Sequence, residues 1–479
     1  MIESLGLGYY QRMSDLASDS AFTVIDLFAG CGGFTQGFHE FRPVGDIASG
    51  PVFTSVAAVE RDRAAAATYS ANFGSLREGT ESMTASPRMW VNDIQQFEPA
   101  GKELEADAIV GGPPCQGFSA LNRAKKGLDR NSLWREYVRV VREVRPKIFV
   151  IENVDRFVTS AEFSDLLEEV APGGTLQDYE LADPWGPADP SQTAHRPPSR
   201  YLLNAADYGA PQSRRRVIIV GVRRDISARH PFTYPQHTHS QYASGRQVKA
   251  EQSSLFDLAE VGHDALPWRR VSEVFSESRP LPLKPGDTLK GTVYFYEAEH
   301  EIPGIFNTAD LHIGRNPVAL SLARYAAIPP GGNRKDLREK WYTVDEGGVI
   351  RIFDTPEPPQ VATPVEYLST ESWDNHDNGT GDVMGRLRSD QPSVTIRTEF
   401  FKPEKGRYLH PVDDRPITHY EAARIQGFPV DFRWCGSKVE IARQIGNAVP
   451  IPLGRAIASS IYACLHGAAG TRPASQPMP

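Results

Sequence analysis

Short runs of β-branched and apolar residues alternate with helical stretches in the first half of the chain, and this alternation constrains the fold most. The candidate strands are Thr23 to Leu27, Ser55 to Val59, Ala108 to Val110, Ile148 to Ile151 and Arg216 to Val222. The stretch Leu133 to Val144 repeats apolar residues at helical spacing and ends before Pro146. Strands that alternate with helices predict a parallel sheet with crossover helices. In such a fold, ligands bind at the carboxyl edge of the sheet.

A stiff turn after one of these strands presents a cysteine at that edge. The residues Gly111 to Ser119, with the sequence GGPPCQGFS, come directly after Ala108 to Val110. The two prolines fix their φ angles and reduce the entropy of the loop, so the thiol of Cys115 is held in place. As a thiolate, cysteine is the strongest nucleophile among ordinary side chains. A buried, inert cysteine is the alternative, and the turn favours the nucleophile.

Three features in strand order predict an adenosine-containing cofactor. The glycine-rich run Asp26 to Phe34 allows a tight turn in which the backbone approaches a ligand closely. Glu60 ends the next strand, where a carboxylate can accept hydrogen bonds from a ribose diol. Asp93 and Ile94 offer a carboxylate and an apolar surface for an adenine ring. Each alone fits an ordinary turn or a solvated acid, whereas the three together indicate nucleoside binding.

Two further strand ends carry groups suited to acid and anion chemistry. Glu152 and Asn153 follow the apolar residues Ile148 to Ile151, at the same sheet edge as Cys115. A carboxyl beside apolar residues can serve as an acid. The run Gln212-Ser-Arg-Arg-Arg-Val places arginines at the start of another strand. Guanidinium groups suit phosphates and the carbonyl oxygen of a base.

Composition excludes some classes of protein and leaves the binding partner open. The 479 residues suffice for two or three domains, and 40% hydrophobic with 23% charged residues is ordinary for a soluble globular chain. No apolar run approaches about 18 residues and the N-terminus is polar, so we expect neither membrane insertion nor secretion. The four scattered cysteines predict a reducing, cytoplasmic setting and no metal site. The net charge of −8 does not indicate nucleic-acid binding, although cationic clusters exist locally.

The pattern changes along the chain and predicts a discontinuous architecture. We expect an N-terminal lead (1–21), the first part of the catalytic, cofactor-binding domain (22–224), and a separate irregular domain, mostly β and coil (225–384). A helical C-terminal part (385–467) returns to the catalytic domain, and the Gly/Pro/Ser-rich tail (468–479) is predicted to be disordered.

These segments resemble the ordered motif set of the cytosine-C5 DNA methyltransferases. The matching strings are DLFAGCGGF, VERD, NDI, GGPPCQGFS, IENV, QSRRRV, EAARIQGFP and QIGNAVP. The resemblance implies an α/β fold: a Rossmann-like methyltransferase domain with a mixed, mostly parallel sheet, and a smaller irregular target-recognition domain over 225–384. It also implies S-adenosyl-L-methionine as cofactor and double-stranded DNA as substrate.

The resemblance assigns the chemistry to residues of this sequence. Cys115 would attack C6 of a cytosine flipped out of the duplex, and Glu152 would hold and protonate the N3 edge. Arg216 would contact the cytosine O2, Arg214 would support Cys115 and the backbone phosphate, and Asn153 would fix the loop around Glu152. Gln116 to Asn131 would form a mobile loop over the minor-groove side. The implied DNA contacts are Gln116, Ser119, Arg123, Lys125, Gln212 and Thr395, with Thr395 on the phosphate of the flipped nucleotide.

The resemblance also assigns the cofactor pocket. Phe28, Ala29, Gly30 and Gly32 would line the methionine and ribose side, Glu60 would bind the ribose, and Asp93 with Ile94 would bind the adenine. The remaining implied wall residues are Pro113, Leu133, Asn447, Ala448 and Val449. Arg61 stands where some relatives carry an aromatic residue that stacks on the adenine.

Two other functions compete with a DNA methyltransferase. An RNA methyltransferase acting on tRNA cytosine is disfavoured by the size of region 225–384, because reading a duplex needs an extra domain. A catalytically silent DNA-binding protein is disfavoured by the presence of Cys115, Glu152 and Arg216. We favour a monomeric prokaryotic modification enzyme, in restriction-modification or phage defence, with a cognate restriction endonuclease or defence-system proteins as partners. The DNA target sequence cannot be read from the chain.

Overall fold

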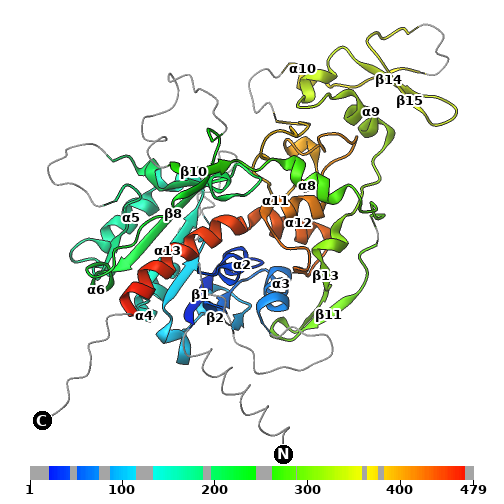
Figure 1. The fold of residues 1–479 in the computed structure, drawn as a ribbon. Helices are drawn as coiled ribbons and strands as arrows, with labels where there is room; N and C mark the ends of the chain where they lie inside the picture. Colours follow the sequence, from blue (N-terminus) through cyan, green and yellow to red (C-terminus); the bar gives the residue numbers. More distant parts are fainter. Residues whose placement is uncertain are drawn as a thin grey trace, which may run out of the picture.

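The computed structural model describes residues 21–43, 51–74, 87–114, 133–186, 196–243, 261–286, 288–358, 364–375 and 382–469. Figure 1 shows an α/β body crossed by the C-terminal helix, and a smaller module around α9, β14 and β15 that projects from it. The N-terminal lead up to residue 20 and the tail from residue 470 lie outside the described residues.

An eight-stranded sheet organises the body, in the order β3-β2-β1-β4-β5-β8-β6, with β7 paired to β8. β1 to β5 pair in parallel, and β8 runs antiparallel to β5, β6 and β7. The predicted α/β fold with a mixed, mostly parallel sheet is therefore confirmed. The strands are β1 (Phe22–Leu27), β2 (Phe53–Val59), β3 (Arg88–Trp90), β4 (Ala108–Gly111), β5 (Ile148–Asn153), β6 (Tyr179–Leu181), β7 (Leu202–Asn204) and β8 (Arg215–Arg223).

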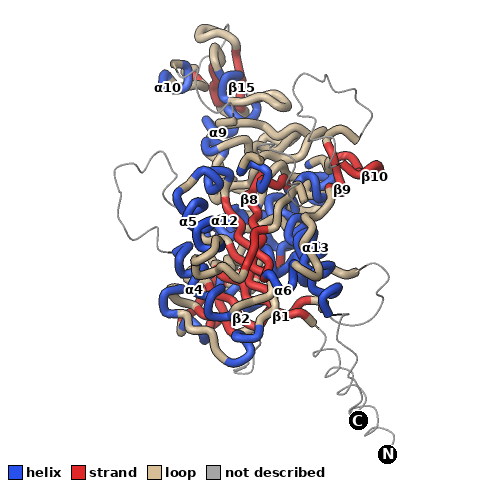
Figure 2. The backbone as a smooth tube through the Cα atoms, turned by 90° about the vertical axis from the view of Figure 1, so that its left-hand side faces the viewer, coloured by secondary structure: helices blue, strands red, loops and turns tan. Residues whose placement is uncertain are grey.

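Helices cover both faces of this sheet. Figure 2 shows the strands nearly edge-on, with α4 and α5 on one side and α13 on the other. The predicted helix over 133–144 is confirmed as α4 with these bounds. The helices of the catalytic body are α2 (Gly33–Glu40), α3 (Arg63–Phe73), α4 (Leu133–Val144), α5 (Ala161–Val170), α6 (Arg224–Ser227), α11 (His419–Gln426), α12 (Lys438–Asn447) and α13 (Ile451–Ala469).

Region 225–384 contains short strands and also helices, so it is less purely β and coil than expected. Its helices after α6 are α8 (Val271–Ser278), α9 (Ala319–Ala327) and α10 (Glu371–Asp374). Its strands are β9 (His237–Ser240), β10 (Val261–Pro267), β11 (Thr292–Phe295), β12 (His300–Pro303), β13 (Phe306–Asn307), β14 (Trp341–Val344), β15 (Ile350–Phe353) and β16 (Glu366–Tyr367). β13 pairs with β17 (Arg433–Trp434), which links the region to the C-terminal part.

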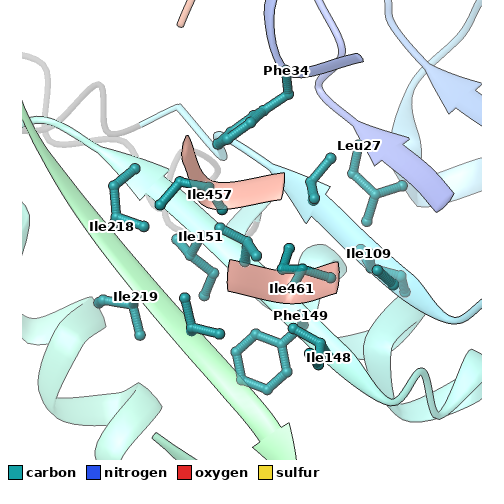
Figure 3. Packing of buried hydrophobic residues seen from close by; sticks show 14 of the residues in the cluster. Leu27, Phe34, Ile109, Ile148, Phe149, Ile151, Ile218, Ile219, Ile457 and Ile461 are labelled. Carbon is teal, nitrogen blue, oxygen red and sulfur yellow. The ribbon is translucent and has the colours of Figure 1, made fainter. Parts of the chain in front are cut away.

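The main core brings the C-terminal helix onto the sheet. Ile457 and Ile461 of α13 pack over Ile109 and Ile151 of the central strands (Figure 3). α13 also crosses α2 closely: a Cβ added to Gly37 of α2 would lie only 2.7 Å from the backbone nitrogen of Arg455 in α13. The last described helix thus belongs to the same core as the first strand. Within the described ranges no single helix is long and apolar enough to span a membrane. The bent pair α12 and α13 would have the length and composition of a span only if the two helices are taken together.

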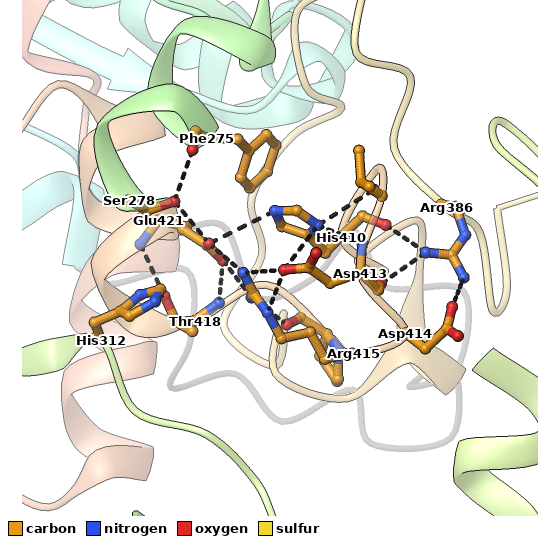
Figure 4. Close-up of polar contacts among 12 residues, drawn as sticks. Phe275, Ser278, His312, Arg386, His410, Asp413, Asp414, Arg415, Thr418 and Glu421 are labelled. Atoms are coloured by element: carbon orange, nitrogen blue, oxygen red, sulfur yellow. Dashed lines mark hydrogen bonds and ion pairs between the residues drawn. The ribbon is translucent and has the colours of Figure 1, made fainter. Parts of the chain in front are cut away.

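A buried polar network ties α8 to the start of α11 (Figure 4). Glu421 is fully buried, and its carboxylate accepts hydrogen bonds from Arg415 at 2.8 Å, Thr418 N at 2.8 Å and Ser278 Oγ at 3.0 Å. Burial alone would raise the pKa of Glu421, but the Arg415 guanidinium and these bonds hold it below its usual value. The network fixes the position of region 225–384 on the C-terminal part.

Candidate active site

A cavity of about 660 Å³ lies at the carboxyl edge of the parallel strands, where ligands were predicted to bind. Its walls come from the turns after β1, β2, β3, β4 and β5, from the start of β8, and from residues 395–398, 443–444 and 446–449. The predicted site residues that line it are Phe28, Ala29, Gly30, Glu60, Arg61, Asp93, Ile94, Pro113, Leu133, Glu152, Asn153, Arg214, Arg216, Thr395, Asn447, Ala448 and Val449. Gly32 lies just behind this wall, as the N-cap of α2.

The glycine turn after β1 needs unusual backbone angles. Phe28, Gly30 and Gly32 have φ angles of 57°, 56° and 90°, and such a conformation costs a non-glycine residue about 1–3 kcal/mol. The next residue, Gly33, allows the C-terminal part to approach: a Cβ there would lie 2.7 Å from the Val449 oxygen. The turn therefore joins sequence segments from both ends of the chain in one wall of the cavity.

Gly33→Ala tests this close approach. Helix propensity alone would make the alanine variant more stable by up to about 1 kcal/mol, because Gly33 opens α2. We expect the opposite sign, a loss of about 1–3 kcal/mol in the free energy of unfolding, because the added methyl group meets backbone atoms of Val449. Urea denaturation of the wild type and the variant measures this difference in the free energy of unfolding. A stabilised variant would show that the two segments are not packed this closely.

Glu60 links the turns after β1 and β2. Its carboxylate accepts hydrogen bonds from Gly30 N at 2.9 Å and from Asp62 N at 2.7 Å. Burial raises the pKa of Glu60 above its usual value, although both bonds oppose the shift. Asp93 also lines the cavity: its Oδ2 lies 3.8 Å from Nη1 of Arg61, whose side chain is 73% exposed. The two carboxylates can accept hydrogen bonds from a diol and from an amino group.

Asp26 is a cavity residue whose individual role the sequence did not indicate. It is 2% exposed, and its Oδ2 accepts a hydrogen bond from Thr35 Oγ1 at 2.8 Å. Burial raises the pKa of Asp26 to about 7, and the negative charge of Glu60 adds to this shift while the Thr35 bond opposes it. Only the tertiary structure reveals the raised pKa of Asp26, because it depends on which residues bury this carboxyl group in the fold.

Asp26→Asn should change how stability depends on pH. In the unfolded chain Asp26 loses its proton near its ordinary pKa of 3.8, whereas the folded protein keeps the proton until about pH 7. The folded state therefore binds more protons in this window, so the wild type loses stability relative to the variant as pH rises from about 4 to 7. Above pH 7 the difference should be constant. Urea denaturation of both proteins across this range measures the difference, and parallel curves would contradict a raised pKa.

Glu152 and Arg216 form an ion pair where β5 ends and the neighbouring strand β8 begins. Glu152 Oε1 lies 2.9 Å from Arg216 Nε, and the two side chains are 13% and 15% exposed. Gly112 leaves room for this carboxylate, since a Cβ there would lie 2.9 Å from Glu152 Oε2. Asn153 Nδ2 donates to the Pro113 oxygen at 2.9 Å and so fixes the turn after β4 against the end of β5. The predicted acid, its supporting amide and a guanidinium are thus together in the cavity.

Arg214 is a buried residue that links the start of β8 to backbone oxygens of the C-terminal part. It is 1% exposed, and its guanidinium donates to the oxygens of Ile396 at 3.0 Å, Gly446 at 3.0 Å and Asn447 at 3.4 Å. Burial, with the nearby charge of Arg216, lowers the pKa of Arg214 to about 9. The described contacts give it a positioning role between β8 and the C-terminal part, and they do not support the expected phosphate contact.

Gln212 does not have the surface position that a DNA contact needs. The side chain is fully buried: its Oε1 accepts from Ile396 N at 2.8 Å and its Nε2 donates to Gln426 Oε1 at 2.7 Å. The expectation that Gln212 contacts DNA is corrected on this ground, because both ends of the amide are bonded within the protein. Thr395 lines the cavity, and its hydroxyl donates to the Ser213 oxygen at 3.2 Å.

The predicted nucleophile and its loop lie outside the described residues, namely Cys115, Gln116, Ser119, Arg123 and Lys125. Pro114 lines the cavity, and Cys115 is the next residue in the chain. The described cysteines do not compete with it: burial raises the thiol pKa of Cys31, Cys435 and Cys464. Within the described ranges, no group of His, Cys, Asp and Glu could hold a metal ion.

Comparison with known proteins agrees with this geometry. Residues 22–463 match the family described as C-5 cytosine-specific DNA methylase. The Type II methyltransferase M.AgeI of Thalassovita gelatinovora is 29% identical, over 91% of this chain and 98% of that protein. M.XorII of Xanthomonas oryzae pv. oryzae is 28% identical over 92% and 84%, and M.DdeI of Desulfomicrobium norvegicum is 26% identical over 91% and 88%. The match over nearly the whole chain shows that this protein belongs to the C-5 cytosine-specific DNA methylase family.

Proposed function

We propose that this DNA (cytosine-5)-methyltransferase transfers a methyl group from S-adenosylmethionine to C5 of a flipped-out cytosine, through a temporary bond between Cys115 Sγ and C6. The observation that carries the proposal is the ion pair of Glu152 and Arg216, whose side chains lie 2.9 Å apart in the cavity. Pro114 lines the same cavity, and Cys115 is the next residue in the chain. Cytosine N3 and O2 are neighbouring atoms on one edge of the base. Groups that bind them must also be neighbours, as these two side chains are.

The proposed reaction gives each residue a balanced step. The Cys115 thiolate adds to C6, and the ring electrons move toward C5 and the N3–O2 side. In its protonated form Glu152 donates a proton to N3, and Arg216 stabilises the charge on O2. Both groups act on charge that develops only during the reaction. When bound, S-adenosylmethionine supplies an electrophilic methyl group to C5. C5 then loses its proton to a base, the Cys115 thiolate is expelled, and N3 returns its proton to Glu152, which restores the aromatic ring.

The donor set of the cavity fits this cofactor. Glu60 is held by two backbone N–H groups beside the glycine turn and can accept hydrogen bonds from the ribose hydroxyls. Asp93 and the apolar Ile94 suit the adenine amino group and ring face. Asn447 to Val449 would close the methionine side against Gly33. The buried carboxyl of Asp26 lies in the same wall, where a sulfonium cation is a favourable neighbour.

The biological role that we propose is protective methylation of DNA. The similar bacterial proteins are named Type II methyltransferases, which supports a modification enzyme that works beside a restriction endonuclease or other defence proteins. We propose a monomer that acts on duplex DNA in the cytoplasm. The DNA-reading residues would come from region 225–384, which the polar network around Glu421 fixes beside the catalytic body.

Expression in a host without cytosine methylation tests this function. Bisulfite sequencing of the host DNA should reveal one recurring sequence in which a cytosine resists conversion. Cells that express Cys115→Ser provide the matched control and should show full conversion. Incubation of the purified protein with labelled S-adenosylmethionine and either DNA or tRNA distinguishes the substrates. Label in tRNA and none in DNA would contradict the proposal.

A further inference from the structure

A second hollow adjoins the catalytic cavity. This groove has a volume of about 950 Å³ and is bounded by Ser213, by the ends of β9 and β10, and by residues 390–394 and 405–408. Thr395 and Arg397 line both the groove and the catalytic cavity. These two residues therefore lie at the junction of the two hollows, on a segment that follows region 225–384.

The backbone around Arg397 is held on both sides by buried groups. Ile396 N donates to Gln212 Oε1 at 2.8 Å, and the Ile396 oxygen accepts from Arg214 at 3.0 Å. On the other side, a Cβ on Gly446 would lie 2.4 Å from the carbonyl carbon of Arg397, so α12 presses directly on this peptide. Arg397 thus projects from a rigid support.

The guanidinium of Arg397 is exposed and has no ion-pair or hydrogen-bond partner among the described residues. Three neighbouring cations are compensated: Arg216 pairs with Glu152 at 2.9 Å, Arg443 with Asp62 at 3.1 Å, and Arg407 with Asp382 at 3.2 Å. Arg270 also has no ion pair among the described residues, but it lines only the groove and does not reach the junction. An uncompensated cation on a rigid support is suited to an anion that arrives from outside, because little freedom is lost on binding.

We propose that Arg397 binds a phosphate of the DNA strand that carries the target cytosine, where this strand passes from the groove to the catalytic cavity. The inference rests on the proposed function and adds a positioning residue to it. Guanidinium groups bind phosphates through paired, charge-assisted hydrogen bonds. The chain as a whole has a net charge of −8, so local cations at the junction must supply the attraction. A phosphate contact at this point would fix the register of the strand without reading its sequence.

Neutral phosphates test the contact. The probe is a short fluorescent duplex containing the site found by bisulfite sequencing, with single methylphosphonates placed in turn around the target cytosine. For the wild type, one of these substitutions should weaken binding roughly tenfold. Arg397→Ala should lose a similar factor on unmodified DNA, and the same methylphosphonate should then have no further effect. The slope of log affinity against log salt should fall by about 0.9, as for one lost phosphate contact.

Two matched variants complete the experiment. Arg142→Ala removes an exposed arginine of α4 that lines neither hollow, and it should keep wild-type affinity and salt slope. Arg397→Lys retains the charge and should recover part of the lost affinity. An Arg397→Ala variant with unchanged affinity and salt slope would overturn the inference, and so would a loss confined to S-adenosylmethionine affinity. Failure of the wild type to methylate DNA would instead refute the proposed function.

Discussion

Cys115→Ser should reduce methyl transfer to DNA by at least about a thousandfold in kcat. A hydroxyl is far less acidic than a thiol and is a poor nucleophile without a base to activate it, so the addition to C6 would be lost. The measurement is incorporation of labelled methyl groups into a duplex that contains the site found by bisulfite sequencing. Binding of the same duplex should change little, because the substitution removes one sulfur atom and no charge contact with phosphate.

A second cysteine of the chain provides the control for this result. Cys464 in α13 is 3% exposed, and its Sγ donates to the His230 oxygen at 3.1 Å, a bond that serine can also make. Cys464→Ser should therefore keep the activity of the wild type. Equal activity of Cys115→Ser and the wild type would exclude a cysteine nucleophile at this position.

Glu152→Gln should lower kcat by about 100- to 1000-fold. Glutamine has nearly the same shape and can still hydrogen-bond to the base edge, but it cannot donate the proton that N3 needs. It also removes the carboxylate that lies 2.9 Å from Arg216, so the guanidinium loses its partner in the cavity. Steady-state kinetics with a labelled methyl donor measure the effect. Because the interaction acts in the transition state, the loss should appear in kcat far more than in the DNA affinity.

Glu168→Gln is the matched control for this substitution, since Glu168 is an exposed residue of α5 that does not line the cavity. It should have wild-type kinetics. If Glu152→Gln raises only KM and keeps kcat, Glu152 positions the base and does not supply a proton. The kinetic split therefore separates the two roles of this residue.

Much of the catalytic body could be predicted because strand periodicity is a local property. The long strands β1, β2, β5 and β8 are rich in apolar and β-branched residues, and α4 ends two residues before Pro146. The cavity could also be predicted, because the carboxyl ends of parallel strands meet at one edge. β3, β6 and β7 were not predicted, since three residues each are too few to show a period.

The remaining features depend on contacts between distant segments. Gln212 resembles a DNA-binding amide in the sequence, but Ile396 and Gln426 return from far along the chain and cover it. Part of the arginine cluster near β8 is compensated in the fold, where Arg223 pairs with Asp225 and Arg224 with Glu180. Arg397 follows Thr395 in the sequence without a signal of its own, and it becomes notable because it lines both hollows and has no ion pair among the described residues. Which charges remain uncompensated is a property of the folded chain.

Duplex DNA that carries 5-fluorocytosine at the methylated position tests the bond between Cys115 and C6 most directly. After methyl transfer, the fluorine on C5 cannot leave as a proton does, so the Cys115 thiolate cannot be expelled. With S-adenosylmethionine present, the wild type should form a stable complex whose mass equals protein plus methylated DNA, and peptide mapping should place the link at Cys115. Absence of a covalent complex, or a link at any other residue, would contradict the proposed mechanism.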